Sequence, residues 1–350
     1  MQRLRFGIIG SGKISQYSAQ SIVNHPRAEL TAAQDINRKR AEQLASAFEI
    51  PHCFTEASEL FACDEVDAVY IAVPNKYHAE LSIAAMRAGK HVLLDKPFAM
   101  NAQEAEEVLR VSEETGQLFA LGMNQRFNEN SQKIKAVVQS GAFGEIYYAK
   151  AYWMRREGIP RLGTWFGSKA LAGAGSIYDI GVHLLDLSLY LMDNFEPVSV
   201  FGSTYTKFGN RGLGESDWGL SDKTDSIFDV DDLAAAMIKL KNGATVCLET
   251  SWASHIPENE RLNVELFGTD LGASVYPAKL YKRDPLDADY RTIENIAAKP
   301  GLPHCDRFHN FINHLFEDEP LIVSGEQALA VQRILDAIAE SCRSGKSIDL

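Results

Sequence analysis

Over the first 124 residues, short apolar runs alternate with longer segments in which apolar residues recur every three or four positions. Near-continuous apolar runs are typical of parallel strands buried on both faces, and the longer period is typical of helices that cover them. The pattern predicts strands at 5–10, 28–35, 67–73, 91–95 and 118–124, and helices at 15–24, 38–48, 78–87 and 102–115. We therefore expect residues 1–124 to form an α/β domain with a doubly wound parallel sheet.

After residue 124 the predicted strands become longer and follow one another closely. Strands are expected at 145–156, 197–208, 232–240, 244–254, 261–269 and 273–277, and helices at 128–140, 176–192 and about 326–343. The segment KNGA at 241–244 is a hairpin-type turn between two of these strands. Residues 125–350 are thus predicted to form a second, α+β domain with a large, mainly antiparallel sheet, which would bind substrate and mediate oligomerisation.

Composition narrows the class of function. Two domains are natural for 350 residues, and a net charge of −12 argues against nucleic-acid or anionic-membrane partners, because both need basic surface. The five cysteines are dispersed without a CxxC pair, which is typical of reduced thiols. The chain begins directly with an apolar strand and holds no apolar stretch of membrane-spanning length. We expect a cytoplasmic protein.

The segment GIIGSGKIS at 7–15 joins the first predicted strand to the first helix. Gly10 can make a tight turn, Gly12 lets the backbone approach a pyrophosphate, and a small Ser15 stands where GxGxxG has its third glycine. The helix that follows offers N–H groups to phosphate. Asp35 ends the second strand and is expected to accept hydrogen bonds from ribose hydroxyls, which favours NAD. Arg38 could bridge a 2′-phosphate and leaves NADP open. These features predict a Rossmann dinucleotide-binding domain.

The segment LLDKPFAM at 93–100 is unusual, because a strand that reads as fully buried ends on an acid, a base and a proline. Asp95, Lys96 and Pro97 would lie at the carboxyl end of a sheet strand, where ligands bind in open α/β sheets. A strand-capping Asp–Lys ion pair, followed by a proline that starts a loop, is the purely structural alternative.

A second group of ionisable residues lies in YDIGVHLLD at 178–186. Asp179 and His183 are four residues apart on a predicted helix and so share a face, with Asp186 roughly on the same side. A neighbouring carboxylate favours the imidazolium and can orient the ring for general base catalysis. A helix salt bridge beside a half-buried histidine is the structural alternative.

Together these motifs resemble the Gfo/Idh/MocA family, the glucose-fructose oxidoreductase and inositol dehydrogenase-like enzymes. The similarity spans nearly the whole chain and includes GIIGSGKIS, RKRAEQLA, DAVYIAVPNKYHAE, AGKHVLLDKP, MNQRF, GAGSIYDIGVHLLDL and SGEQALAVQRILDAIAESCRSGKSIDL. The resemblance implies that Lys96 reaches the oxygen of the reacting carbon beside the nicotinamide, and that Asp179 and His183 are catalytic. The family commonly has Glu where this chain has Asp95, which is one methylene shorter.

The motifs and the resemblance together give two sets of candidate binding residues. Cofactor binding is expected at Gly10, Gly12, Lys13, Ile14, Asp35, Arg38, Pro74, Asn75, His78, Asp95, Lys96 and Asn124. Substrate binding is expected at Lys96, Arg126, Tyr152, Trp165, Asp179 and His183, with residues 153–156 and His255 as further candidates. The aromatic residues among them could equally be strand residues that face a core. No metal is expected, because His304, Cys305, His309 and His314 lack zinc-site spacing.

The leading hypothesis is an NAD(P)-dependent enzyme that transfers a hydride between nicotinamide and a hydroxyl or carbonyl carbon of a sugar, cyclitol or related polyol. His183, oriented by Asp179, would take the hydroxyl proton while Lys96 holds the same oxygen, and which of the two is the kinetic base stays open. The resemblance also allows an NAD-dependent glycosidase that oxidises its substrate transiently, or a non-catalytic NAD-binding sensor. A homodimer or homotetramer through the second sheet is expected. The loops at 155–174 and 209–226 are expected to determine the substrate.

Overall fold

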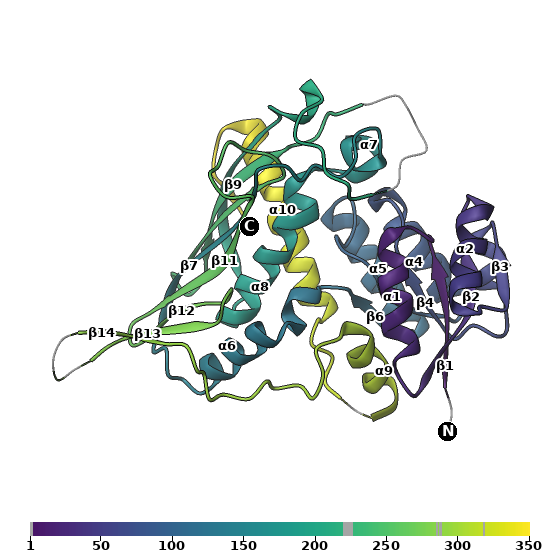
Figure 1. Cartoon of the computed structure of the whole chain (residues 1–350), viewed down its shortest axis with the longest axis horizontal. Helices are drawn as coiled ribbons and strands as arrows, with labels where there is room; N and C mark the ends of the chain where they lie inside the picture. Colours follow the sequence, from purple (N-terminus) through teal and green to yellow (C-terminus); the bar gives the residue numbers. More distant parts are fainter. Residues whose placement is uncertain (1–2, 220–226, 285, 287–288, 318) are drawn as a thin grey trace.

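The computed structural model describes residues 3–219, 227–284, 286, 289–317 and 319–350. The last part of the loop predicted at 209–226 therefore lies outside the described residues. The described chain contains a six-stranded and a nine-stranded sheet, which lie on opposite sides of the molecule with helices between them (Figure 1). No helix in this part of the chain is both long and apolar enough to cross a membrane.

The first sheet has the strand order β3-β2-β1-β4-β5-β6 with every pairing parallel. Its strands are β1 (Leu4–Ile9), β2 (Ala28–Gln34), β3 (His52–Phe54), β4 (Ala68–Ile71), β5 (His91–Leu94) and β6 (Phe119–Leu121). This is the order of a Rossmann fold, and it confirms the predicted doubly wound sheet. Because the order reverses between β1 and β4, a crevice is expected outside their carboxyl ends.

The helices of the first domain are α1 (Lys13–Val23), α2 (Arg38–Phe48), α3 (Ala57–Phe61), α4 (His78–Arg87) and α5 (Ala102–Thr115). Local capping explains why several predicted bounds agree with the structure. Asn37 and Asn101 each accept a backbone hydrogen bond from the first turn of α2 and α5, and Gly116 ends α5 in the left-handed conformation.

The second sheet has the order β14-β13-β12-β11-β7-β10-β9-β8-β15. Its strands are β7 (Ile146–Arg155), β8 (Pro197–Tyr205), β9 (Leu233–Leu240), β10 (Thr245–Ser251), β11 (Glu260–Gly268), β12 (Gly272–Ser274), β13 (Lys279–Arg283), β14 (Tyr290–Ile293) and β15 (Ile348–Asp349). The β9–β10 hairpin turns at the predicted KNGA segment. Among the described strands of this sheet, only β7 and β10 pair in parallel, so the sheet is mainly antiparallel, as predicted.

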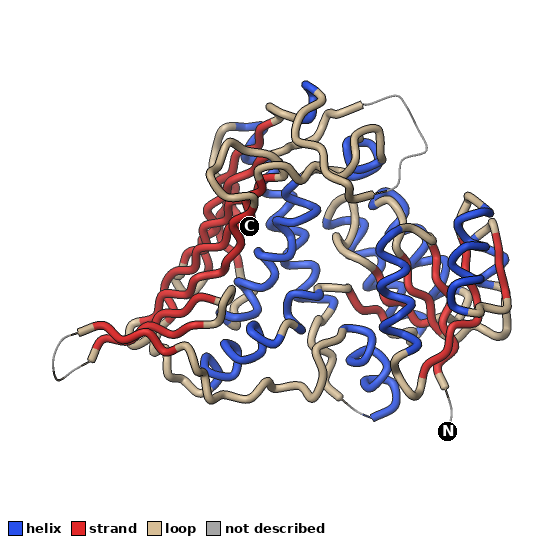
Figure 2. Tube along the Cα trace, in the orientation of Figure 1, coloured by secondary structure: helices blue, strands red, loops and turns tan. Residues whose placement is uncertain are grey.

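The other helices are α6 (Glu129–Gln139), α7 (Lys169–Ala172), α8 (Val182–Met192), α9 (Arg307–Glu317) and α10 (Gly325–Ser344). Helices α8 and α10 lie on the side of the second sheet that faces the first domain (Figure 2). On that side Ala149, Ala151 and Leu248 are fully buried. In the part of the chain that the structure describes, no helix covers the other side, where Phe201 and Met237 expose 51% and 55% of their surface.

Helix α9 packs on the first sheet, although it follows the second sheet in the chain. The ring of Phe308 lies 6.5 Å from that of Phe6 and 5.0 Å from that of Tyr70. The predicted boundary at 124/125 therefore separates the two sheets, but residues 125–350 are not one spatial unit. A division at one residue cannot describe a helix that returns to the other domain.

Candidate active site

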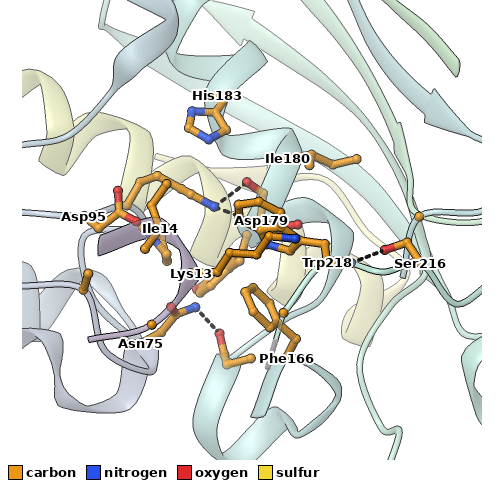
Figure 3. Close-up of a pocket in the computed structure, with 18 of the residues that line it drawn as sticks. Lys13, Ile14, Asn75, Asp95, Phe166, Asp179, Ile180, His183, Ser216 and Trp218 are labelled. Atoms are coloured by element: carbon orange, nitrogen blue, oxygen red, sulfur yellow. Dashed lines mark hydrogen bonds and ion pairs between the residues drawn. The ribbon is translucent and has the colours of Figure 1, made fainter. Parts of the chain in front are cut away.

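A pocket of about 710 Å³ lies between the two domains, outside the carboxyl ends of the strands of the first sheet (Figure 3). The predicted residues that line it are Gly12, Lys13, Ile14, Asn75, Asp95, Lys96, Asn124, Trp165, Asp179 and His183. The fold thus brings the nucleotide motif, the strand end at 95–96 and the helix at 179–183 into one cavity. This is the arrangement that a dinucleotide and a second ligand require.

The turn after β1 fits a pyrophosphate. Gly10 has a φ of +86°, and a Cβ there would lie 2.3 Å from the carbonyl oxygen of Ala72, so only glycine makes this turn without strain. A Cβ on Gly12 would meet nothing within 4 Å, which leaves room for phosphate against the backbone. The N-terminus of α1 has no side-chain cap among the described residues, so its first N–H groups can bind an anion. The Ser15 hydroxyl donates to the Gly10 carbonyl and fixes the turn.

Asp35 is buried behind this turn. Its carboxylate accepts hydrogen bonds from the backbone N–H groups of Ser11 and Asn37, each at 2.8 Å. Arg38 does not line the pocket: its guanidinium pairs with Glu42 at 2.8 Å on the surface of α2, and its cofactor role stays a prediction. Arg40, two residues further on, lines the pocket in its place.

His78 and Pro74 also lie outside the lining of the pocket. The imidazole of His78 is buried, with Nδ1 2.7 Å from the carbonyl oxygen of Pro97 and Nε2 3.0 Å from that of Val73. His78 therefore joins the loops after β4 and β5, and its prediction as a cofactor contact is wrong. Asn75, next to Pro74, does line the pocket, where its amide donates to the carbonyl of Ala172 at 2.8 Å.

Lys96 and Asp179 form the ion pair at the centre of the pocket. The Lys96 Nζ lies 2.8 Å from both Oδ1 and the backbone carbonyl oxygen of Asp179 (Figure 3). Asp179 belongs to a π-helical turn (Ile177–Gly181) at the start of α8, and such turns are frequent at functional sites. The other carboxylate oxygen, Oδ2, accepts a hydrogen bond from the indole of Trp252 at 2.8 Å. Burial alone raises the pKa of Asp179, but the Lys96 charge and these hydrogen bonds outweigh burial and hold it below its usual value.

His183 lines the same pocket but has no hydrogen bond to Asp179. Both Asp179 oxygens are occupied by Lys96 and Trp252, and the buried Nδ1 of His183 has no hydrogen-bond partner within the described chain. The prediction that Asp179 orients His183 is therefore wrong. The Asp179 carboxylate does favour the imidazolium, as predicted, but other groups outweigh its effect. Burial, reinforced by the charge of Lys96, holds the pKa of His183 well below its ordinary value, so the ring is neutral at pH 7.

Arg126 and Asp186 form a separate, fully buried pair. The Arg126 guanidinium donates to both carboxylate oxygens of Asp186 at 2.8 and 2.6 Å, and to the carbonyl of Ile322 at 2.7 Å. With 0% of its surface exposed, Arg126 cannot reach a substrate. Its predicted role in substrate binding is wrong, and the pair instead joins the domain junction to α8.

Tyr152 lies on the face of β7 that points away from the pocket, and its hydroxyl is 3.2 Å from Glu265. Its predicted substrate contact is therefore wrong, whereas its neighbour Trp153 lines the pocket. The Trp153 indole and the Arg155 guanidinium both donate to Oε1 of Glu260, at 2.6 and 2.9 Å. Trp165 stacks on Phe166 with ring centroids 3.9 Å apart, and both rings line the pocket together with Trp153.

Four residues that the sequence did not single out also belong to the site. Glu260, Trp218 and Arg307 line the pocket, and Trp252 contacts Asp179 from behind it. Trp218 lies over Lys13 of the nucleotide turn, with the ammonium 4.7 Å from the ring centroid. The contact between Asp179 and Trp252 could not be predicted from a local sequence pattern, because the two residues belong to different elements.

The histidines at 304–314 lie around α9, away from the pocket. His304 pairs with Glu319 at 2.8 Å, and the rings of His25 and His309 are in edge contact. In the described part of the chain, no group of three or more His, Cys, Asp or Glu residues is arranged to hold a metal ion.

Comparison with known proteins agrees with this geometry in both domains. The profile of an oxidoreductase family with an NAD-binding Rossmann fold, GFO_IDH_MocA, matches residues 4–123, and the GFO/IDH/MocA C-terminal domain matches residues 131–273. The chain belongs to the GFO/IDH/MocA family. As a member of this family it is an oxidoreductase that uses NAD, and the resemblance inferred from the motifs is confirmed.

Individual GFO/IDH/MocA relatives match almost the full length. D-glucoside 3-dehydrogenase of Escherichia coli (strain K12) is 29% identical over 99% of this chain and 97% of that enzyme. Myo-inositol 2-dehydrogenase of Thermotoga maritima is 23% identical over 99% and 98%. A solved structure of levoglucosan dehydrogenase, in complex with NADH and levoglucosan, has a TM-score of 0.83 at 23% identity and covers 99% of both chains. These relatives are similar to the protein in fold and in the order of both domains.

Proposed function

We propose that the protein is a dehydrogenase that transfers a hydride between NAD and a hydroxyl or carbonyl carbon of a neutral sugar, cyclitol or related polyol. The observation that carries the proposal is the position of Lys96, Asp179 and His183 in one pocket with the pyrophosphate turn. The names of the relatives, which include a glucoside and an inositol dehydrogenase, support the substrate class.

Lys96 and His183 would divide the work on the substrate oxygen. The ammonium has three N–H donors, of which two bind Asp179; the third has no acceptor among the described residues and would bind the oxygen of the reacting carbon. The neutral imidazole of His183 would accept the hydroxyl proton and return it in the reverse direction. Bound NAD supplies the acceptor for the hydride. The protein contributes position and charge.

The charges of the pocket around Lys96 and Arg155 favour a neutral substrate. Lys96 is paired with Asp179, and Arg155 with Glu260. Among the residues of β7 and its continuation that line the pocket, the other charged one is Glu157, an acid. An anionic substrate would thus meet paired cations and an additional carboxylate, whereas hydroxyls and the apolar faces of a sugar ring match the polar groups and the aromatic rings of Trp153, Trp165 and Phe166.

The first experiment follows reduced-nicotinamide absorbance while the purified protein meets NAD or NADP with polyols, inositols, aldoses and glycosides. A rise with at least one neutral compound is expected, and a rise only with sugar phosphates or sugar acids would contradict the proposed substrate class. The relatives described above are named as dehydrogenases, so they give no support to the glycosidase or sensor alternatives. Release of aglycone without net reduction of NAD would favour the glycosidase.

We further propose a homodimer or homotetramer in the cytoplasm that pairs through the uncovered face of the second sheet. Phe201, Met237 and Cys247 lie side by side in register on that face, and an exposed apolar stripe of this kind favours burial against a second subunit. The dispersed free cysteines support a reducing compartment. Light scattering should give a multiple of 38.7 kDa for the wild type and a smaller mass for Met237→Lys. A monomeric wild type would contradict the oligomer.

A further inference from the structure

Trp252 follows strand β10 and is the largest fully buried side chain of the second domain. Its ring packs among Ile159, Ile180 and Val230, and it meets Phe228 in an edge contact at 6.5 Å. Its backbone N–H donates to the carbonyl of Asp232 at 2.8 Å. Because both backbone and ring are held, the direction of the indole N–H is fixed by the core.

That N–H points to the active-site carboxylate. It lies 2.8 Å from Oδ2 of Asp179, while Oδ1 of the same carboxylate lies 2.8 Å from Nζ of Lys96. A carboxylate that accepts one strong hydrogen bond on each oxygen cannot rotate without breaking one of them. Indole nitrogen is a donor only, so this contact does not depend on a tautomer or an amide flip.

We propose that Trp252 is a positioning residue of the active site, which orients Asp179 so that the carboxylate holds the ammonium of Lys96 and not the imidazole of His183. Trp252 acts through Asp179 and touches neither substrate nor cofactor. The inference rests on the proposed function for its kinetic consequence, whereas the hydrogen bond itself can be tested without turnover.

The proposal explains the unequal roles of the two basic groups. With Asp179 fixed on Lys96, two N–H groups of the ammonium have acceptors on Asp179, and the third has none in the described part of the chain. His183 is left without a carboxylate partner in the described chain and stays neutral. If Asp179 could rotate, it could pair with either group, and the ammonium would lose its fixed direction.

The kinetic test is Trp252→Phe, which keeps an aromatic ring in the core and removes the N–H. We expect kcat to fall about tenfold to a hundredfold, as for loss of a hydrogen bond to a charged group, with KM and NADH affinity nearly unchanged. Tyr276→Phe is the matched control. It removes a half-buried hydroxyl that donates to Gln125 at 2.7 Å outside the pocket, and its kcat should match the wild type. Equal kcat for Trp252→Phe and the wild type would overturn the proposal.

The structural test uses the wild-type fold and needs no substrate. The chain has four tryptophans, so a protein labelled with ¹⁵N in the indole should give four N–H resonances, and Trp153→Phe, Trp165→Phe and Trp218→Phe assign the fourth by elimination. We expect the Trp252 resonance to lie downfield and to move in both Asp179→Asn and Lys96→Met, but not in Tyr276→Phe. If the Trp252 resonance keeps its position in both active-site variants, the proposal is overturned, even if the enzyme proves to have another substrate.

Discussion

Lys96 and His183 line the same pocket, but in the described part of the chain only Lys96 has a carboxylate partner. The ammonium of Lys96 has a carboxylate partner, Asp179, at 2.8 Å. His183 has no such partner in the described chain, so desolvation decides and the ring is neutral. A cationic donor and a neutral base thus stand beside each other, which is what transfer of a proton from a polarised hydroxyl requires.

Removing either group should strongly lower turnover without weakening nucleotide binding. Lys96→Met and His183→Asn are each expected to lower kcat by about 10²–10⁴-fold, the usual contribution of a positioned acid or base. NADH affinity, measured by fluorescence titration, should stay close to that of the wild type. Lys90→Met is the control, because its ammonium is also buried, 2.8 Å from the carbonyl of Val66, but lies away from the pocket. Wild-type kcat in either active-site variant would contradict the assigned roles.

The state of His183 also sets the pH dependence. Its folded-state pKa is depressed well below the ordinary 6.5, and the pKa of Asp179 is depressed as well. As pH falls, the ring therefore stays neutral and the carboxylate ionised past pH 6.5, and activity is lost only well below it. We expect kcat/KM for the oxidation to stay flat from pH 8 to about 6. An acid limb centred at or above pH 6.5 would show that the base is not a desolvated histidine.

At the scale of single elements, the turn after β1 contains two glycines, Gly10 and Gly12, that are needed for different reasons: one for the backbone conformation and one for space for the ligand. Gly10→Ala should destabilise the fold by more than about 1–2 kcal/mol, because its positive φ is costly for alanine and the new Cβ would meet the Ala72 carbonyl. Gly12→Ala should leave the melting temperature nearly unchanged but weaken NADH binding about tenfold or more (~1.4 kcal/mol). Thermal unfolding without nucleotide and an NADH titration separate the two effects. Equal effects on stability would contradict the distinction.

The elements that could be predicted from sequence are those whose signals are local. Helices 38–48, 78–87 and 102–115 begin and end where predicted, and two of them have asparagine caps. Strand β3 is three residues long and half-buried, too short for a period to appear. Strands β14 and β15 are the edge strands of their sheet and β13 lies next to β14, and in all three exposed residues hide the alternation.

The candidate site was predictable as a set of motifs but not as a set of contacts. Lys96, Asp179 and His183 do share a pocket. Their pairing could not be inferred from a four-residue spacing, because a π-helical turn begins at Ile177 and the competing donor, Trp252, comes from a distant strand end. Arg126 was misassigned for a similar reason. A motif arginine looks the same in sequence whether it faces a ligand or a buried aspartate.

At the scale of the whole molecule, Arg126 connects the end of the first domain to two helices of the second. Arg126 lies in the 3₁₀ turn (Asn124–Phe127) that follows the first domain. It pairs with Asp186 on α8 and donates to the carbonyl of Ile322 before α10. Both side chains of the pair have 0% exposure. A pair so completely desolvated is costly to break on one side, because the remaining charge cannot reach water.

Arg126→Met should therefore lower the free energy of unfolding by about 3–5 kcal/mol, since it leaves Asp186 buried and unpaired. The double variant Arg126→Met/Asp186→Leu removes both charges and should recover much of that loss, because well-packed apolar residues often replace a buried ion pair at little cost. With the single variant Asp186→Leu and the wild type, urea denaturation followed by tryptophan fluorescence gives the four free energies of the cycle. If the two substitutions were simply additive, the pair would not be coupled and the junction would depend on packing alone. Recovery of stability in the double variant, together with weaker NADH binding or lower kcat, would show that the ion pair sets the relative position of the domains around the pocket.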